Sequence, residues 1–451
     1  MKAIFICSPS RAYGEINTIV PLARGILSAG GEVWILASPL AAAIARQHFP
    51  TRVHELTPDL ERNQNILRLM VKKFRPDLIA LAELYEILRP NRKADCPLIS
   101  RRFLRWIAGV DCTLVFLDFI AHVPMLRSVA ECPVCAGQLG RHVLNSFLRR
   151  LWVVLPCPLN EPGIVGQRCG IPYRSHELPL QIDENAILET RSRFLGKGHE
   201  RDRFLILRTG STWQTQLAEQ RGHCLYEHLG DILAEYLCGL PKPITVISIS
   251  SRHKLQCSTG DLQIINITNL PPHEFDQLAL SSDLVVTDNE IGYTMARTLG
   301  RVPGMVLVNS LRASDVLRRE RSGSRLREIV SIMERKRPNC IYPHKIFPIP
   351  ADEDEFADSN AGTEGACRVS HHEPRTIRLG RLVSSAFIRT ELYGGQDTRR
   401  AFEAILCDPE QQARLKRMDE GFIDRLNRID DGVSVLQRLV TRDSIRDHTV
   451  L

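Results

Sequence analysis

One segment near the N-terminus constrains the fold of this chain more than any other feature. Residues 5–38 read FICSPSRAYGEINTIVPLARGILSAGGEVWILAS: an apolar run, a Gly-Glu turn, a stretch with helical spacing, a Gly-Gly turn and a second apolar run. Two parallel strands need a crossover connection, and a helix of about four turns between two buried strands makes one βαβ unit. The segment therefore predicts a parallel sheet.

The same alternation of strands and helices continues along the chain and falls into two series. Strands that are apolar on both faces and alternate with helices are typical of parallel sheets covered on both sides. The predicted strands are 3–7, 32–38, 77–83, 112–119 and 151–158 in the first series, and 204–211, 244–250, 262–268, 283–289 and 304–310 in the second. We expect an α/β fold with two Rossmann-like domains facing across a cleft and with closing C-terminal helices.

The 451 residues suit two or three domains, and the breaks between the series set their bounds. We predict an N-terminal domain over 1–190 and a C-terminal domain over 200–350. The Arg-rich run 191–204 is interpreted as a solvated linker. Residues 351–390 begin strongly acidic and lack periodicity, which is typical of a flexible surface insertion. Residues 391–451 are expected to form helices that pack back on the N-terminal domain.

Composition limits the class of protein and of partner. Hydrophobic residues make up 43% and charged residues 25%, as in soluble globular proteins. The net charge is +7, from 59 basic and 52 acidic residues, and this excess is spread along the chain, which does not favour nucleic-acid binding. No apolar run approaches the length of a transmembrane segment. Thirteen cysteines, several in strand-like runs, indicate reduced thiols and a cytoplasmic protein.

Two short motifs raise the question of a metal site. Cys132 and Cys135 have zinc-knuckle spacing, but no second CxxC pair follows, so loop or core cysteines are favoured. His371 and His372, beside Glu373, are adjacent residues in a loop and carry little metal-binding signal. We therefore predict no metal ion.

Three turns after predicted strands carry the residues suited to bind a ligand. Ligands of parallel α/β domains bind outside the carboxyl ends of the strands, where backbone N–H groups and helix N-termini are exposed. The residues at these turns are Gly14 and Glu15 in the first, Gly210, Ser211 and Thr212 in the second, and Asp288, Asn289, Glu290, Gly292, Tyr293 and Thr294 in the third. Each turn taken alone also reads as an ordinary capped connection, but three at the same edge favour a binding site.

These stretches resemble the GT-B superfamily of glycosyltransferases. Its members typically begin with a strand, a Gly-His-x-Asn-Pro turn, and a helix ending in Arg-Gly-His-Glu-Val. The segment GEINTIVPLARGILSAGGEV follows that pattern without a gap. The segment NLPPHEFDQLALSSDLVVTDNEIGYTMARTLGRVP is similar to the nucleotide-sugar half of these enzymes. The resemblance covers residues 1 to about 310.

The resemblance implies an acceptor domain at 1–190, a donor domain at 200–350, and a nucleotide base held by Asn269, Leu270 and His273. Many members use the His of the first turn to deprotonate the acceptor hydroxyl, and this chain has Glu15 there. A carboxylate could serve as the base if its pKa were raised by burial or by a neighbouring anion, and it could equally be an inert helix cap.

Two further departures lie in the second half. Glu290 stands in place of a phosphate-loop glycine, and Ala296 in place of an acid that binds the ribose hydroxyls. They put ordinary binding of a nucleotide sugar in question, although not the fold.

The predicted function is transfer of a sugar from a nucleotide-diphosphate sugar, as co-substrate rather than resident cofactor, to a small-molecule acceptor. Two alternatives stay open. One is a GT-B fold recruited to another reaction, such as epimerisation or an amide- or ester-type transfer. The other is a non-catalytic partner protein that keeps the fold.

Overall fold

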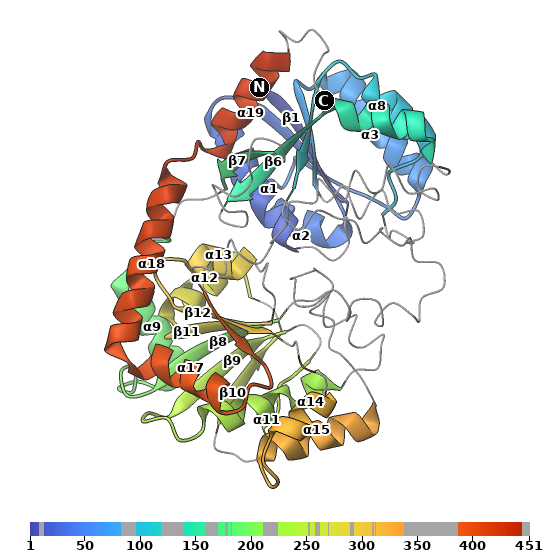
Figure 1. The fold of residues 1–451 in the computed structure, drawn as a ribbon. Helices are drawn as coiled ribbons and strands as arrows, with labels where there is room; N and C mark the ends of the chain where they lie inside the picture. The colour runs from blue at the N-terminus through green and yellow to red at the C-terminus, as the bar shows by residue number, and fades with distance from the viewer. Residues whose placement is uncertain are drawn as a thin grey trace. The chain divides into compact units, whose positions relative to one another are not determined.

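The computed structural model describes most of the chain and divides it into two compact units. The described residues are 1–8, 13–82, 96–118, 137, 139–157, 170–175, 179–181, 183–210, 224–250, 253–257, 262–268, 270–288, 293–308, 311, 313–337 and 387–443. Unit 1 contains the described residues of 1–176 and 426–443, and unit 2 those of 177–337 and 387–425. Each unit is an α/β structure built on its own parallel sheet (Figure 1).

The sheet of unit 1 has seven strands in the order β3-β2-β1-β4-β5-β6-β7, and all neighbouring strands are parallel. The chain starts in the middle, builds outward through β3, and then crosses to the other side of β1. The strand order therefore reverses between β1 and β4. The strands are β1 Lys2–Cys7, β2 Glu32–Ala37, β3 Val53–Glu55, β4 Leu78–Ala82, β5 Thr113–Leu117, β6 Leu151–Cys157 and β7 Ile171–Arg174.

Helices cover both faces of this sheet because right-handed crossovers on the two sides of β1 place them on opposite faces. One face carries α1 and α2, and α19 packs on α1 and β7. The other face carries α3, α5 and α8, which share one apolar core with the central strands (Figure 1). The helices are α1 Tyr13–Ser28, α2 Pro39–His48, α3 Leu60–Phe74, α5 Arg101–Ala108, α8 Arg141–Arg150 and α19 Gly432–Asp443.

The sheet of unit 2 has six parallel strands in the order β10-β9-β8-β11-β12-β13, with its reversal between β8 and β11. Its strands are β8 Phe204–Thr209, β9 Ile244–Ile249, β10 Gln263–Ile267, β11 Leu284–Thr287, β12 Gly304–Val308 and β13 Ile388–Glu391. Its helices are α9 Glu184–Leu195, α11 Leu225–Leu237, α12 Pro272–Ser281, α13 Tyr293–Thr298, α14 Ala313–Arg319, α15 Arg325–Lys336, α17 Gln396–Cys407 and most of α18 Pro409–Asn427. The prediction of two Rossmann-like domains is confirmed.

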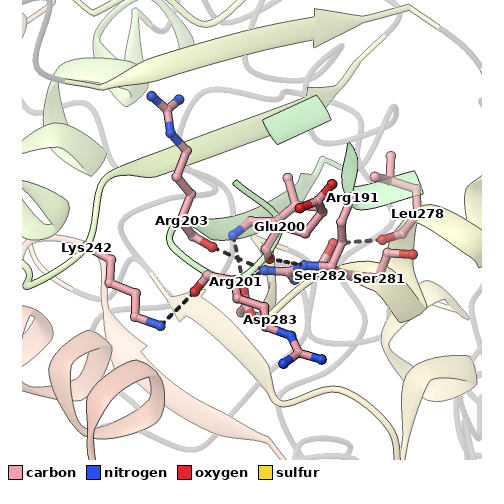
Figure 2. Close-up of polar contacts among 10 residues, drawn as sticks. Arg191, Glu200, Arg201, Arg203, Lys242, Leu278, Ser281, Ser282 and Asp283 are labelled. Carbon is pink, nitrogen blue, oxygen red and sulfur yellow. Dashed lines mark hydrogen bonds and ion pairs between the residues drawn. The ribbon is translucent and has the colours of Figure 1, made fainter. Parts of the chain in front are cut away.

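The interpretation of 191–204 as a solvated linker is wrong. Residues 184–195 form helix α9, which packs on α12. Figure 2 shows the Arg191 guanidinium surrounded by backbone oxygens and a carboxylate. It donates to the carbonyl oxygens of Glu200, Arg203 and Ser281 at 2.8, 3.1 and 2.7 Å and to Asp283 Oδ2 at 3.1 Å. An Arg has five N–H donors in a rigid fork, so one side chain fixes α9 to the amino edge of the sheet.

The C-terminal region also differs from the prediction. Strand β13, Ile388–Glu391, lies at the edge of the second sheet beside β12, although residues 388–390 were assigned to the flexible insertion and residue 391 to the closing helices. Helix α17 packs on α11 and β13 in unit 2, so of the C-terminal helices α19 is the one that packs within the N-terminal unit. Residues 351–386 lie outside the described part of the chain.

The packing of α19 is close. A Cβ atom on Gly25 of α1 would lie 2.5 Å from Val433 Cγ2, and one on Gly432 would lie 2.7 Å from the Tyr173 ring. The glycines allow the two helices and β7 to approach one another. Within the described residues, no helix has the length and hydropathy needed to cross a membrane.

Candidate functional site

The carboxyl edges of the two sheets carry the candidate functional residues. Gly14 and Glu15 follow β1, Gly210 follows β8, Leu270 and His273 follow β10, and Asp288 follows β11. Strands in a parallel sheet point the same way, so the predicted residues within each unit share one edge. This is the edge at which ligands bind in folds of this class, next to the reversal of strand order.

Several predicted site residues lie outside the described part of the chain. Ser211, Thr212, Asn269, Asn289, Glu290 and Gly292 are not among the described residues. Tyr293 and Thr294 form the first turn of α13, and the description covers their backbone only. Of the described residues, His273 is exposed in the first turn of α12, and Leu270 is half-buried just before it.

Glu15 has an unusual environment for a carboxylate. It lies in the first turn of α1, where the helix dipole favours a negative charge. Its Oε2 atom is shielded from solvent and accepts no hydrogen bond from the described residues. Burial raises the pKa of Glu15 to about 7, and the hydrogen bond with its own backbone N–H opposes this only in part. Desolvation therefore outweighs the helix terminus, and this carboxyl group is half ionised near neutral pH.

Other polar groups line the same edge of unit 1. Ser8 follows β1 and is 5% exposed, and its hydroxyl has no hydrogen-bond partner in the described part of the chain. Asp118 follows β5 and is fully buried. The pairing of Cys7 with Ala82 and of Ala82 with Leu117 places Ser8 and Asp118 at the same level, with β4 between their strands. The edge near Glu15 therefore has a further group, the Ser8 hydroxyl, able to bind a ligand hydroxyl.

The carboxyl edge of unit 2 contains a buried ion pair instead. Arg208 near the end of β8 donates through Nη2 to Asp288 Oδ2 at 3.4 Å, and their side chains are 3% and 9% exposed. The Tyr226 hydroxyl donates to the same Oδ2 at 2.8 Å. The Arg208 guanidinium also lies over the Tyr226 ring, with Cζ 5.6 Å from the centroid. Each buried charge is thus matched by a neighbour.

Two glycines make this arrangement possible. A Cβ on Gly210 would lie 2.6 Å from Arg208 Nη2, so a larger residue would displace the guanidinium. A Cβ on Gly230 of α11 would overlap the backbone of Gln256, so glycine lets α11 approach the segment after β9. That segment includes His253, whose ring stacks on Tyr226 with centroids 5.1 Å apart and planes 13° apart.

Sequence reasoning identified Asp288 and Gly210 but missed Arg208, Tyr226 and His253. One signal for Arg208 was available. An Arg in the apolar strand FLILRT must be buried with a counter-charge, because an unpaired buried charge is costly. Nothing local to the sequence identifies Asp288 as that partner, which lies 80 residues away.

The described residues contain no cluster of three or more His, Cys, Asp or Glu side chains arranged to hold a metal ion. The CxxC pair at Cys132 and Cys135 and the His371–His372 pair both lie outside the described residues.

Solved structures similar to this chain are glycosyltransferases with little sequence in common. The spinosyn forosaminyltransferase SpnP is 13% identical, with a TM-score of 0.52 over 98% of this chain and 99% of that one. The glycosyltransferase SnogD from Streptomyces nogalater is 12% identical, with a TM-score of 0.51 over 98% and 99% of the two chains. The glycosyltransferase VinC, solved in complex with DTDP, is 12% identical, with a TM-score of 0.50 over 99% and 100%. The resemblance in fold to the GT-B superfamily is confirmed.

Comparison of this sequence with protein-family models identifies its family. No curated protein matches the chain by sequence. A family model described as "Family of unknown function (DUF6365)" matches residues 22–352, which is more than half of the chain. The chain is therefore a member of the DUF6365 family, built on the GT-B fold.

Proposed function

We propose that this protein is a glycosyltransferase-like enzyme that transfers a sugar from a nucleotide-diphosphate sugar to a hydroxyl group of a small-molecule acceptor. The observation that carries the proposal is the state of Glu15, whose Oε2 is buried without a partner among the described residues and whose pKa is raised to about 7. A general base is most effective when its pKa is near the working pH.

Glu15 acts as that base. Its carboxylate takes the proton of the acceptor hydroxyl while the hydroxyl oxygen attacks the anomeric carbon of the donor sugar. The bond from that carbon to the diphosphate breaks, and the nucleoside diphosphate leaves with the bonding electron pair. Ser8, on the same edge of unit 1, is suited to hold the acceptor through a hydrogen bond.

Unit 2 binds the donor. Gly210, Ser211 and Thr212 after β8, with the start of α13 at Tyr293 and Thr294, contact the phosphates, and the segment from Asn269 to His273 lies against the base. Backbone N–H groups and helix N-termini of this kind favour anions. VinC, which has a similar fold, was solved with DTDP, and this supports a nucleoside diphosphate as the ligand. Asp288 holds Arg208 in place beside Gly210.

Titration calorimetry of the folded protein with a panel of UDP-, GDP- and dTDP-sugars tests this function. We expect one nucleotide class to bind, with heat that the free sugar does not reproduce. Absence of heat with every member of the panel would remove the glycosyltransferase proposal.

One observation favours a second candidate, a GT-B fold that performs another reaction or that serves as a non-catalytic partner protein. The carboxylate of Asp288 is already held by Arg208 and Tyr226, so it is engaged before any donor arrives. The same panel separates these cases. A non-catalytic partner protein binds no nucleotide sugar, whereas an epimerase binds one and converts it without any acceptor, which NMR of the sugar nucleotide detects.

A further inference from the structure

One face of unit 1 carries a dense array of positive charge. Helices α3, α5 and α8 cover this face. We use the name basic face for seven of the cations on their outer side. They are Arg68, Lys72, Lys73, Arg102, Arg105, Arg141 and Arg149. Helices α5 and α8 contain no acidic residue at all, and the acids of α3 are confined to its cap Asp59 and first-turn Glu61. The excess charge is concentrated here, which the sequence reading of an even spread missed.

The three helices lie side by side and point the same way. Gln64 of α3 donates to Ser100 before α5, and Arg68 one turn later lies over the Trp106 ring at 5.5 Å. At the far end of α5, Arg150 of α8 donates to the carbonyls of Ala108 and Val110. The cations of the three helices therefore form one continuous surface.

The helix dipole favours some of these cations and opposes others. Lys72, Lys73 and Arg149 lie in last turns, where the helix dipole favours positive charge. Arg102 and Arg141 lie in the first turns of α5 and α8, where the dipole opposes it. An arginine in a first turn therefore destabilises its helix. A binding role for these arginines would explain why they are there.

These cations have no counter-charges among the described residues. None of the seven forms an ion pair with another described residue, whereas exposed arginines of unit 2 do. Arg193 pairs with Glu274, Arg318 with Asp315, and Arg400 with Asp397. Unit 1 therefore keeps its positive charge available at this face.

Apolar groups accompany the charge. Leu69 of α3 is 51% exposed, next in sequence to Arg68. Trp106 of α5 is half-buried beneath Arg68 and packs against Phe103. A surface of parallel helices with outward arginines, an exposed leucine and an interfacial tryptophan has the features of a peripheral membrane-binding face. Nucleic acid is usually held in a charged groove or by a helix that enters a groove of the duplex, and neither arrangement occurs among these helices.

We propose that the basic face of unit 1 docks the protein on an anionic phospholipid bilayer. Arginines bind phosphate oxygens through paired N–H donors, and a bilayer with anionic headgroups presents such phosphates over an area as broad as three helices. Leu69 enters the headgroup region beside them. The proposal concerns a surface separate from the candidate catalytic residues and does not depend on the proposed function.

Flotation with lipid vesicles tests this docking. The native protein should float with vesicles that contain phosphatidylglycerol and stay behind with vesicles of phosphatidylcholine alone, and added salt should weaken the binding because it screens exposed charges. The triple variant Arg102→Gln, Arg105→Gln, Arg141→Gln should bind roughly a hundredfold more weakly, since each cation near the surface contributes about fivefold.

A matched variant controls for total charge. Arg193→Gln, Arg318→Gln, Arg400→Gln removes the same charge from exposed, paired positions of unit 2 and should float like the native protein. The variant Arg102→Lys, Arg105→Lys, Arg141→Lys keeps the charge and should retain most of the binding. Circular dichroism melts of all variants separate lost docking from lost folding.

Three results would overturn the proposal. They are equal binding to both kinds of vesicle or to neither, equal loss in the unit 1 and unit 2 variants, and binding of a duplex DNA oligonucleotide in place of vesicles.

Discussion

Glu15 in unit 1 and Asp288 in unit 2 are carboxylates at the carboxyl edges of two similar units. Each lies at the carboxyl edge of a parallel sheet, beside the reversal of strand order. Asp288 is held by a buried guanidinium and a tyrosine hydroxyl. Glu15 has an oxygen that is shielded from water and lacks a partner in the described structure.

The difference shows that carboxylates at the same kind of sheet edge can serve two purposes. Arg208 and Tyr226 hold the Asp288 side chain in place, so it has a structural role. Burial raises the pKa of Glu15 to about 7, which leaves it with a proton that it can take up or give away. The experiments below alter one carboxylate or its partners at a time.

The largest effect is expected at Glu15. Replacing Glu15 with Gln keeps its shape but removes the basic lone pair, so turnover should fall by roughly 10²–10⁴ while donor affinity changes little. If the proposed function holds, kcat/KM of the native protein should rise with pH through about 7, because the base must be ionised. Glu32→Gln, an exposed partner of Lys2, serves as the control. If Glu15→Gln keeps full turnover, Glu15 is a helix cap.

Breaking the pair in unit 2 should give the next largest effect. Arg208→Met leaves the buried Asp288 charge without its counter-ion and should lower the free energy of unfolding by about 3–5 kcal/mol in urea titrations. The exposed pair Arg318–Asp315 provides the comparison, and Arg318→Met should cost less than about 1 kcal/mol. Adding Asp288→Leu to Arg208→Met should recover much of the loss. Equal costs for the two single variants would mean that burial does not distinguish the pairs.

Asp419 of α18 is an intermediate case that sharpens the comparison. Its Oδ2 accepts from the Gly300 N–H at 3.1 Å, while Oδ1 is buried and has no partner among the described residues. Burial raises the pKa of Asp419 to about 6, against 3.8 normally. The folded state therefore binds the proton more tightly than the unfolded state, and this contribution to stability is lost as pH rises through 6.

Asp419→Asn keeps the acceptor for Gly300 and removes the charge. The variant should be more stable than the native protein by about 2–3 kcal/mol at pH 8, and the gain should vanish at about pH 3, below the unfolded pKa of Asp419, where the carboxyl group is neutral in both the folded and the unfolded state. Thermal melts across this pH range measure it. A gain that does not vary with pH would show that the charge of Asp419 is not responsible.

The smallest change removes one of the hydrogen bonds to Asp288. Tyr226→Phe keeps the ring that stacks on His253 but loses the hydrogen bond to Asp288, and should cost about 1.5 kcal/mol in urea unfolding. Tyr236 offers a neutral comparison, because its buried hydroxyl donates to the Leu392 carbonyl at 2.6 Å. Tyr236→Phe should cost less than Tyr226→Phe, since hydrogen bonds to charged groups are stronger. The reverse order would mean that the Tyr226 hydroxyl contributes little to holding Asp288.

Much of the fold could be predicted from the sequence because the central strands are apolar on both faces. Strands β1, β4, β5 and β8 are buried at almost every position, and each was predicted. The edge strands β3, β7 and β13 carry no such signal, whereas the edge strand β10 was predicted. In β13 every residue of IRTE is half-buried. Pro172 stands within β7, which an edge strand tolerates because its proline needs no donor on the open side.

The candidate site could be predicted only in part, for a related reason. Turns after strands mark the edge at which ligands bind, so the positions of Glu15, Gly210 and Asp288 follow from local pattern. Pairing between side chains distant in sequence does not, and the buried state of Glu15 depends on packing that the sequence does not show. The different environments of Glu15 and Asp288 therefore follow from the folded structure and not from the sequence.

The close packing of α19 on α1 bears on how the protein is made. Residues that complete the face of the first unit belong to the segment Gly432–Asp443, which is synthesised after all of unit 2. During translation, Gly25 and Leu22 of α1 have no covering helix until that segment leaves the ribosome, and exposed apolar surface of this kind recruits chaperones. A premature stop codon before Gly432 should therefore damage the unit that was synthesised first.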